Sequence, residues 1–464
     1  MPQRSGLPLS CLALLTCVAC NPQLEATVKT NPICDISSVV SWTTKDPASS
    51  WVEVGQGAEP SFRVGSDALV TDHEVVVVGM VADSSYQLEA VSVTDSGKEL
   101  RAEPAVFETG SLPDPWLQGE IAIPDAAAVQ AGWTIANVMN ASLTPITVVI
   151  LDEQGQVVWY FADDDENAGA DIQVSWFHDR GEMLIGPHVA PGDHSFQMDL
   201  QGNVSWEGPE QPGDFNLINL QQGQWHHVLT ELDNGDHVTV QSNYEYVGDD
   251  EIQGDRVIQL DTDNNEVWSW NTFDHLEYDP DDLYMGLWWT HLNSVVVDSD
   301  EDVAYINSWV LGHTFKVDRA SGEILWTLGL GGDFAPDPDA MEPWYQKSHS
   351  FEPIGDDHYV IYDNGDSSRG WSRIMEYALD ESTMQAEIVW QYPEYGEEDV
   401  WWVISCGDVD LLDNGNHLVV ADHRIMELTV EGEIVWEYTW IPGESIHDTR
   451  SYQAERIPAL VEAL

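Results

Sequence analysis

A segment ending in Trp recurs six times between residues 155 and 436, and it constrains the fold more than any other feature. Successive Trp residues are 47, 62, 58, 64 and 46 positions apart. A repeat of this length is typical of propeller blades, which cannot bury their faces alone and stack on their neighbours. The sequence therefore predicts a six-bladed β-propeller over residues 113–464, with the repeated Trp side chains packing blade against blade. The copies are GQVVW (155–159), GNVSW (202–206), NNEVW (264–268), GEILW (322–326), AEIVW (386–390) and GEIVW (432–436).

Residues 21–112 lack this repeat and predict a separate domain. Short alternating segments such as VVSW, WVEVG and YQLEAVSVT are separated by Gly, Asp and Ser turns, and no helical period is present. This spacing indicates a small β-sandwich. The stretch from SYQLEAVSVTDSGKE to FETGSLP resembles the end of a fibronectin type III module, and PDPW at 113–116 is expected to be a linker. The predicted fold class is all-β, a sandwich followed by the propeller.

Residues 1–20 are typical of an export signal. Arg4 precedes the apolar run LPLSCLALLTCVA, which ends at Cys20. The ending CVAC resembles a bacterial lipobox, so Cys20 is a candidate for lipidation; the alternative is a plain signal peptide cut nearby. Either reading predicts an exported protein, periplasmic or at the cell surface. Lipidation of Cys20 would add an N-terminal anchor as its one membrane contact. If Cys20 is lipidated, Cys34 and Cys406 remain, and whether they pair is open.

The chain is strongly acidic. Asp and Glu outnumber Lys and Arg by 82 to 16, which gives a net charge of -66. Nucleic-acid binding needs a basic surface, so this composition argues against a nucleic-acid partner. It also implies self-repulsion at low salt.

Histidines recur at one position of the repeat. Four blades contain a hairpin turn (DNG, DSD, GDD and DNG), and near the start of the strand before each turn stand His227, His291, His349 and Gly407. Equivalent positions of different blades converge at the centre of a propeller, so the three imidazoles should meet at one mouth of the channel. Such a trio can bind a metal or stabilise and attack an anion. Strand alternation predicts that the neighbouring His226 points away.

Longer segments around these histidines resemble bacterial arylsulfate sulfotransferases. The most specific are THLN, SHSFEPIGDDHYVIYDNG followed by SRIMEY, and CGDVDLLDNGNHLVV before GEIVWEY. The likeness is good over about 220–440 and agrees with the predicted sandwich and propeller. It implies transfer of a sulfuryl group from a phenolic sulfate ester to a phenol, without a nucleotide donor. It further implies that His349 is the sulfated nucleophile and that His227 and His291 contact sulfuryl oxygens and handle protons. We expect no cofactor and no metal.

One departure from the family concerns an arginine. The pattern places it where this chain has Trp309, and loss of such a preorganised donor can cost on the order of 10²–10³ in rate. Three basic residues around His349 could supply the missing charge: Lys347, Arg369 and Arg373. Arg373 has an alternative, structural role as a partner of Glu376. Trp289, two residues before His291, is favoured as an aromatic wall of the site, and Trp309 is a further substrate-binding candidate.

Two other readings remain open at the level of the sequence. The first is a non-catalytic propeller that binds a partner or serves as a scaffold lipoprotein, having lost the arginine. The second takes the histidines as metal ligands, as in a hydrolase.

Overall fold

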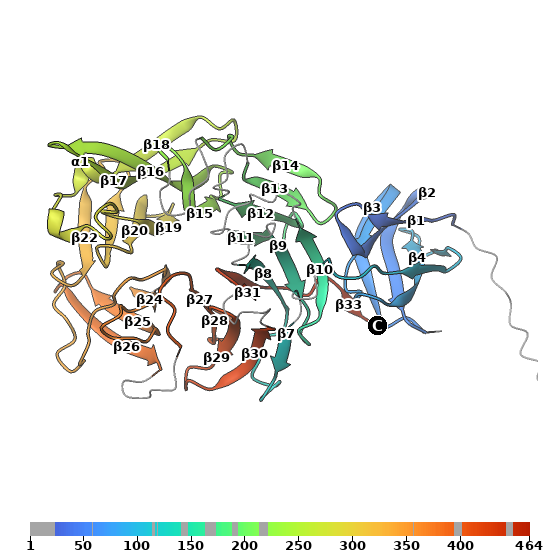
Figure 1. The fold of residues 1–464 in the computed structure, drawn as a ribbon. Coiled ribbons are helices and arrows are strands. Elements are labelled where there is room, and N and C mark those ends of the chain that lie inside the picture. The colour runs from blue at the N-terminus through green and yellow to red at the C-terminus, as the bar shows by residue number, and fades with distance from the viewer. Residues whose placement is uncertain are drawn as a thin grey trace, which may run out of the picture.

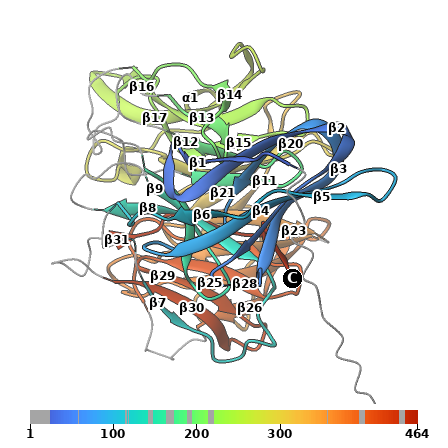
Figure 2. The same cartoon turned by 90° about the vertical axis from the view of Figure 1, so that its right-hand side faces the viewer.

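The computed structural model describes residues 24–57, 59–113, 117, 119–140, 147–162, 173–187, 194–212, 221–355, 357–393, 401–441 and 449–464. Strands make up 57% of the described residues and helices 2%. Six antiparallel sheets follow one another around a ring, and a smaller sheet domain lies at one side of it (Figures 1 and 2). The predicted fold class is confirmed. The expected export segment and Cys20 lie outside the described residues.

The N-terminal sheet domain is built around one long, bent strand. The first half of β2 pairs with β1 and with the end of β3, and its second half pairs with the start of β3 and with β4. The two halves share one core, in which Val40, Trp42, Val52 and Leu88 are buried. The strands are β1 (Thr27–Asn31), β2 (Cys34–Gly55), β3 (Phe62–Val77), β4 (Ser85–Val93), β5 (Glu99–Arg101), β6 (Ala105–Glu108) and, from the other end of the chain, β33 (Glu462–Ala463). The final residues, predicted as propeller, thus belong to this sheet.

Blades 2 to 5 each contain four strands that pair in sequence order, and blades 1 and 6 also include strands from the two ends of the propeller segment. Blade 1 contains β32 (Ala454–Ile457), β8 (Trp133–Asn140), β9 (Thr147–Leu151) and β10 (Val157–Ala162), with β31 (Thr449–Arg450) also on β8. Blade 2 contains β11 (Gln173–Phe177), β12 (Glu182–Gly186), β13 (Phe196–Asp199) and β14 (Val204–Glu207). Blade 3 contains β15 (Trp225–Glu231), β16 (His237–Val247), β17 (Asp250–Leu260) and β18 (Glu266–Asn271).

The remaining blades complete the ring. Blade 4 contains β19 (Leu292–Asp298), β20 (Val303–Ser308), β21 (His313–Asp318) and β22 (Ile324–Gly329). Blade 5 contains β23 (Ser350–Gly355), β24 (His358–Asp363), β25 (Arg373–Asp380) and β26 (Gln385–Tyr392). Blade 6 contains β27 (Asp408–Leu411), β28 (His417–Ala421), β29 (Arg424–Leu428), β30 (Ile434–Trp440) and an added outer strand, β7 (Gly119–Ala122). First strands of neighbouring blades contact one another, β15 with β19, β19 with β23 and β23 with β27.

Within the described residues, helical structure is confined to a short connection between blades 3 and 4, formed by α1 (Thr272–His275) and the 3₁₀ turn η1 (Pro280–Asp282). Of the residues described, none belongs to a helix that is long and apolar enough to cross a membrane.

The repeated Trp residues join the blades. Five of their indole N–H groups donate to an oxygen in the loop between the third and fourth strands of the next blade. The pairs are Trp159 with Leu200, Trp268 with Arg319, Trp326 with Glu381, Trp390 with Val430 and Trp436 with Glu153. The sixth, Trp206, stacks on His237 with ring centroids 3.7 Å apart. The prediction that these side chains pack blade against blade is confirmed.

Both ends of the propeller segment close the ring. β32 pairs with β8 inside blade 1, and β7 pairs with β30 outside blade 6. Arg456 of β32 reaches the fully buried carboxylate of Glu427 on β29, with 2.9 Å between Nη2 and Oε2. The other carboxylate oxygen accepts bonds from the Gln130 backbone N–H and the Asn416 amide, each at 2.7 Å. Blades 1 and 6 are therefore joined by a buried ion pair at the closure.

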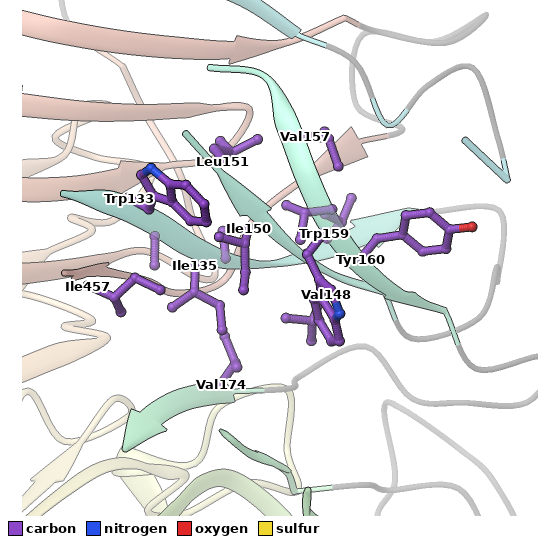
Figure 3. Close-up of a cluster of buried hydrophobic side chains, with 14 of the residues drawn as sticks. Trp133, Ile135, Val148, Ile150, Leu151, Val157, Trp159, Tyr160, Val174 and Ile457 are labelled. Atoms are coloured by element: carbon purple, nitrogen blue, oxygen red, sulfur yellow. The ribbon is translucent and has the colours of Figure 1, made fainter. Parts of the chain in front are cut away.

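The core of blade 1 continues into the N-terminal domain. Figure 3 shows Trp133, Ile150 and Trp159 of this blade together with Val174 of β11. The same cluster includes Cys34, Ile36 and Val78 of the N-terminal sheet, and the Asp35 backbone N–H donates to the Tyr160 hydroxyl at 3.1 Å. The two domains thus share a hydrophobic contact, whereas residues 114–116 of the expected linker lie outside the described residues.

Candidate functional site

The three predicted histidines meet where the first strands of blades 3, 4 and 5 begin. The ring centroids of His227 and His291 lie 4.7 Å apart, and those of His227 and His349 lie 6.2 Å apart. His227 and His291 have positive φ angles of 60° and 47°, a conformation that is uncommon for residues other than glycine and concentrates at functional sites. Residues separated by up to 122 positions in sequence are therefore brought together, as the repeat predicted.

These imidazoles line a cavity of about 150 Å³. A cavity of that size holds one benzene-sized ring. Its wall combines imidazoles, aromatic rings, one thiol and one guanidinium, with contributions from blades 1, 3, 4 and 5. The lining residues are His227, Gln253, Trp288, His291, Trp309, His349, Ser405, Cys406, Arg450 and Tyr452.

The orientation of the His349 ring is set by Asn364, from the YDNG motif. The Asn364 amide nitrogen donates to the carbonyls of Val403 and Cys406, both at 2.8 Å. Its oxygen must therefore face His349 Nδ1, which lies 2.7 Å away. A carbonyl oxygen only accepts, so Nδ1 carries the proton and Nε2 carries the lone pair. A neutral imidazole with this tautomer is suited to nucleophilic attack through Nε2.

The backbone just before His349 is held by Asn293 of the H-x-N motif and by Asn307, both of blade 4. Asn293 and Asn307 both donate to the backbone carbonyl of Ser348, at 2.7 and 3.1 Å, and Asn307 also donates to Asn293. The Ser348 hydroxyl donates back to Asn307 at 2.9 Å. These side chains are buried, so the backbone that carries His349 is held by hydrogen bonds between blades 4 and 5.

His226 does not line the cavity, as predicted, but it contacts the cavity histidines from behind. Its Nδ1 lies 2.8 Å from Nδ1 of His227, and its Nε2 lies 3.1 Å from Oδ1 of Asp255. Its ring also stacks on His291 at 5.9 Å between centroids. The pairing of β15 with β16 shifts between His226 and Leu229. Together with the positive φ of His227, this shift breaks the alternation on which the prediction relied.

Burial keeps the site histidines neutral. Desolvation lowers the pKa of His349 to about 4, although its bond to Asn364 opposes the shift, and Arg450 lowers the pKa further. Desolvation, with His226 as the next cause, lowers the pKa of His291 to about 3. For His227, burial and three neighbouring imidazoles hold the pKa well below its ordinary value. At neutral pH these rings are therefore bases and nucleophiles rather than cations.

Trp288, and not Trp289, forms the aromatic wall next to His291. The rings of Trp288 and His291 are stacked, 4.5 Å apart and 11° from parallel. Trp289 is buried against Phe273, with ring centroids 4.9 Å apart, and does not line the cavity. The prediction of Trp289 assumed strand alternation up to His291, but a turn occupies residues 285–287 and β19 begins only at Leu292.

Trp309 lines the cavity, where its ring lies 5.6 Å from His291 and 6.1 Å from His349. Lys347 lies behind it: its Nζ is 4.5 Å from the Trp309 ring centroid and donates to the Val310 carbonyl at 3.1 Å. Lys347 has a positive φ of 56° and does not face the same way as His349. The predicted lysine thus touches a wall residue without lining the cavity.

Arg369 is not at the cavity, which corrects a second prediction. Its guanidinium and that of Arg373 both bind Asp363, at 2.6 and 2.8 Å, and all three side chains are buried. Arg373 accordingly pairs with Asp363 rather than with Glu376. Of the described residues that line the cavity, Arg450 is the cation. It lies on β31, which pairs with β8.

Sequence reasoning therefore missed Asn364, Asp255, Arg450 and Tyr452. The Tyr452 ring lies 6.0 Å from His227 and 6.1 Å from His349. Asn364 could have been found from its place in the quoted YDNG motif. The other three carry no signal in the repeat. Cys406 lines the cavity and Cys34 lies in the domain contact, so these two cysteines do not form a disulfide with each other.

The described part of the chain contains no group of three or more His, Cys, Asp or Glu side chains arranged to hold a metal ion. Nδ1 of His349 is hydrogen-bonded to Asn364 and Nδ1 of His227 to His226. The geometry thus gives the metal reading no support.

Comparison with known proteins places most of the chain in one family. The family model described as Arylsulfotransferase (ASST) matches residues 123–441. The comparison with curated proteins gives no match. Among solved structures, the periplasmic gluconolactonase of Pseudomonas aeruginosa is similar at 11% identity over 90% of this chain and 99% of its own, with a TM-score of 0.37.

Two further solved structures are similar at the same level. Hydrazine synthase of Kuenenia stuttgartiensis is 11% identical over 61% of this chain and 71% of its own, with a TM-score of 0.36. Sqt1 of Saccharomyces cerevisiae is 9% identical over 91% and 94%, with a TM-score of 0.34. Likenesses this weak carry no argument about the site.

Proposed function

The chain belongs to the arylsulfotransferase family, and from that membership we propose that it moves a sulfuryl group from a phenolic sulfate ester to a phenol through a sulfated His349. The observation that carries this proposal is the geometry of His349. Asn364 fixes its tautomer so that Nε2 holds a lone pair, and burial keeps the ring neutral. A neutral, oriented imidazole at a cavity of one-ring size is suited to attack on sulfur.

The transfer divides into two displacements on sulfur. In the first, His349 Nε2 forms a bond to sulfur while the sulfur–oxygen bond to the aryl group breaks, and the phenolate leaves with a proton. In the second, the acceptor phenol loses its proton, its oxygen attacks sulfur and the nitrogen–sulfur bond breaks. Each half needs a proton donor or acceptor close to sulfur. His227, 6.2 Å from His349 between ring centroids, is the group that we assign to this role.

Arg450 supplies the cation that a sulfuryl group requires. Charge accumulates on the equatorial sulfuryl oxygens in the transition state, and a forked guanidinium is suited to meet it. Arg450 lines the cavity and acts electrostatically on His349, whereas the family position for arginine is Trp309. The alternative of a non-catalytic propeller was based on the loss of the family arginine at Trp309. Arg450 is a cation at the same cavity, so that loss no longer favours the alternative.

Aromatic residues and His291 position the substrate. Trp288 and Trp309 face the cavity from blades 3 and 4 and can stack on the phenyl ring of the donor or acceptor. His291, between them, contacts sulfuryl oxygens through its ring nitrogens. The substrates are small aryl sulfates and phenols.

The experiment is a transfer assay with purified protein, 4-nitrophenyl sulfate and phenol. Nitrophenolate release should depend on phenol, and His349→Ala should abolish it. Without acceptor, a mass spectrum should find a sulfuryl group on the His349 peptide. His358→Ala is the matched control, because His358 lies in the same blade but binds Glu376 at 2.6 Å outside the cavity. Failure of the native protein to release nitrophenolate, or undiminished release by His349→Ala, would overturn the proposal.

We also propose that residues 1–20 direct export, that Cys20 is lipidated, and that the N-terminal sheet domain is related to fibronectin type III modules. The apolar run and the CVAC ending support the first two. In a bacterial host, Cys20→Ser should release the protein from the membrane fraction and abolish labelling with a tagged fatty acid. Equal membrane association of both forms would contradict lipidation.

A further inference from the structure

A buried chain of hydrogen bonds runs behind His227, away from the cavity. His226 lies between Asp255 and His227, with contacts of 3.1 Å to the carboxylate and 2.8 Å between the two Nδ1 atoms. Asp255 and His226 are almost completely buried, and His227 is 5% exposed. Asp255 also accepts bonds from the Thr290 hydroxyl at 2.5 Å and the Leu292 backbone N–H at 2.9 Å. The carboxylate is therefore held firmly, and it holds His226 in turn.

The distribution of protons in this chain follows from the donors and acceptors. Burial alone would raise the pKa of the Asp255 carboxyl, but the hydrogen bonds from His226 and Thr290 outweigh it and hold that pKa below its ordinary value. An ionised carboxylate only accepts, so His226 Nε2 carries a proton. The contact between the two Nδ1 atoms contains one proton, which belongs either to His226 or to His227. Any proton that His227 exchanges with a substrate passes through its other nitrogen, Nε2.

We propose that Asp255, His226 and His227 form a proton relay that serves both halves of the sulfuryl transfer, an inference that rests on the proposed function. Before the donor reacts, His226 is an imidazolium ion beside Asp255, and His227 is neutral with its proton on Nε2. That proton goes to the leaving phenolate oxygen while the Nδ1 proton of His226 moves to Nδ1 of His227. His227 Nε2 then has a lone pair, takes the proton of the acceptor phenol, and returns its Nδ1 proton to His226.

This arrangement avoids placing a second proton on the buried His227 ring. His227 is buried beside three other imidazoles, which makes a second proton on its ring unfavourable. The relay stores the proton on His226 instead, where a carboxylate is in contact and the charge is compensated. One proton is released in the first half and recovered in the second, so the cycle balances without exchange with solvent. Asp255 and His226 are positioning residues in this scheme, and of the three relay residues only His227 touches the substrate.

The test compares two donors whose leaving phenolates differ in basicity. Release of the strongly basic phenolate from phenyl sulfate needs a proton, whereas nitrophenolate leaves without one. The rate is that of the first half alone, sulfation of His349 in the absence of acceptor. Asp255→Asn should therefore slow sulfation by phenyl sulfate about 10²-fold or more, as expected for loss of general acid catalysis, and sulfation by 4-nitrophenyl sulfate much less. His226→Asn retains an acceptor for His227 Nδ1–H but cannot store the proton, so it should show the same selective loss even if Asp255→Asn folds poorly.

The matched control is His237→Asn, the same substitution at a buried histidine that stacks on Trp206 away from the cavity. It should leave the ratio of the two donor rates unchanged. Equal losses with both donors in His226→Asn would overturn the relay while leaving the proposed function intact. Absence of transfer from either donor by the native protein would instead overturn the proposed function itself.

Discussion

Replacing Glu427 with Gln should destabilise the propeller closure strongly. Glu427 is fully buried and accepts bonds from Arg456, the Gln130 backbone and Asn416 at 2.7–2.9 Å. Gln keeps the shape and one acceptor oxygen but leaves the Arg456 charge uncompensated. Removing one partner of a buried pair costs about 3–5 kcal/mol. Burial already lowers the pKa of Arg456, and Glu427 opposes that shift.

The expected change in melting temperature follows from the size of the chain. Unfolding entropy is roughly 2 cal/mol/K per residue, which is roughly 1 kcal/mol/K for 464 residues. Glu427→Gln should therefore lower the melting temperature by about 3–5 °C, measured by circular dichroism at pH 7. Because the pair is buried, the decrease should be similar at low and at high salt.

Glu462→Gln provides the matched control, because Glu462 pairs with Arg63 at 2.5 Å on the surface, with side chains 54% and 34% exposed. An exposed pair contributes about 0–1 kcal/mol, so its loss should shift the melting temperature by about 1 °C or less. The double variant Glu427→Gln/Arg456→Met removes both charges and should be more stable than Glu427→Gln alone. Equal shifts for Glu427→Gln and Glu462→Gln, or a double variant less stable than the single one, would refute the reasoning.

Three further predictions concern charge and pH. Arg450→Met should lower turnover of 4-nitrophenyl sulfate roughly 10²–10³-fold, and Arg450→Lys should lower it less; unchanged turnover in Arg450→Met would exclude this residue as the anion partner. His417 has a pKa lowered by burial from 6.5 to about 4, so the unfolded state takes up its proton first as the pH falls between these values. The decrease in melting temperature from pH 7 to pH 4.5 should therefore be smaller for His417→Leu than for the native protein. Equal decreases in the two proteins would contradict this. Burial and Asp408 raise the pKa of Glu352 from 4.5 to about 7, so its ionisation destabilises the fold as the pH rises through 7. Glu352→Gln should thus be stabilising at pH 8.5 and neutral at pH 5; a gain that is independent of pH would refute the assignment.

The repeat made the ring of blades and the meeting of the histidines predictable. The Trp spacing locates the outer strand of each blade in the sequence, and the hairpin turns locate the first strand of four blades. His227, His291 and His349 could therefore be assigned to one mouth of the channel. Both inferences depend only on the period of the chain, which local irregularities do not change.

The directions of individual side chains next to the histidines were not predictable, because the strands there do not alternate regularly between their two faces. A positive φ at His227 turns His226 toward Asp255, and the turn before His291 exchanges the roles of Trp288 and Trp289. Such backbone conformations leave no pattern in the sequence, because histidine normally avoids them.

The cations show a second limit of sequence reasoning. Arg369 lies close to His349 in sequence, but the buried Asp363 binds its guanidinium in the structure. Arg450 lies 101 positions beyond His349, outside the six repeated segments. It reaches the cavity because the chain returns after blade 6 to pair with β8. Closeness in sequence therefore selected the wrong arginine.

That return has a consequence for how the protein matures. The blades that carry His227, His291 and His349 are synthesised before Arg450 and Tyr452, so a chain terminated before Thr449 has the proposed nucleophile without its proposed anion partner. Proteolytic trimming ahead of Thr449 would leave the same incomplete centre. If these proposed roles hold, the site becomes complete only when the segment that pairs with β8 has been made, so closure of the ring and completion of the cavity occur in one step.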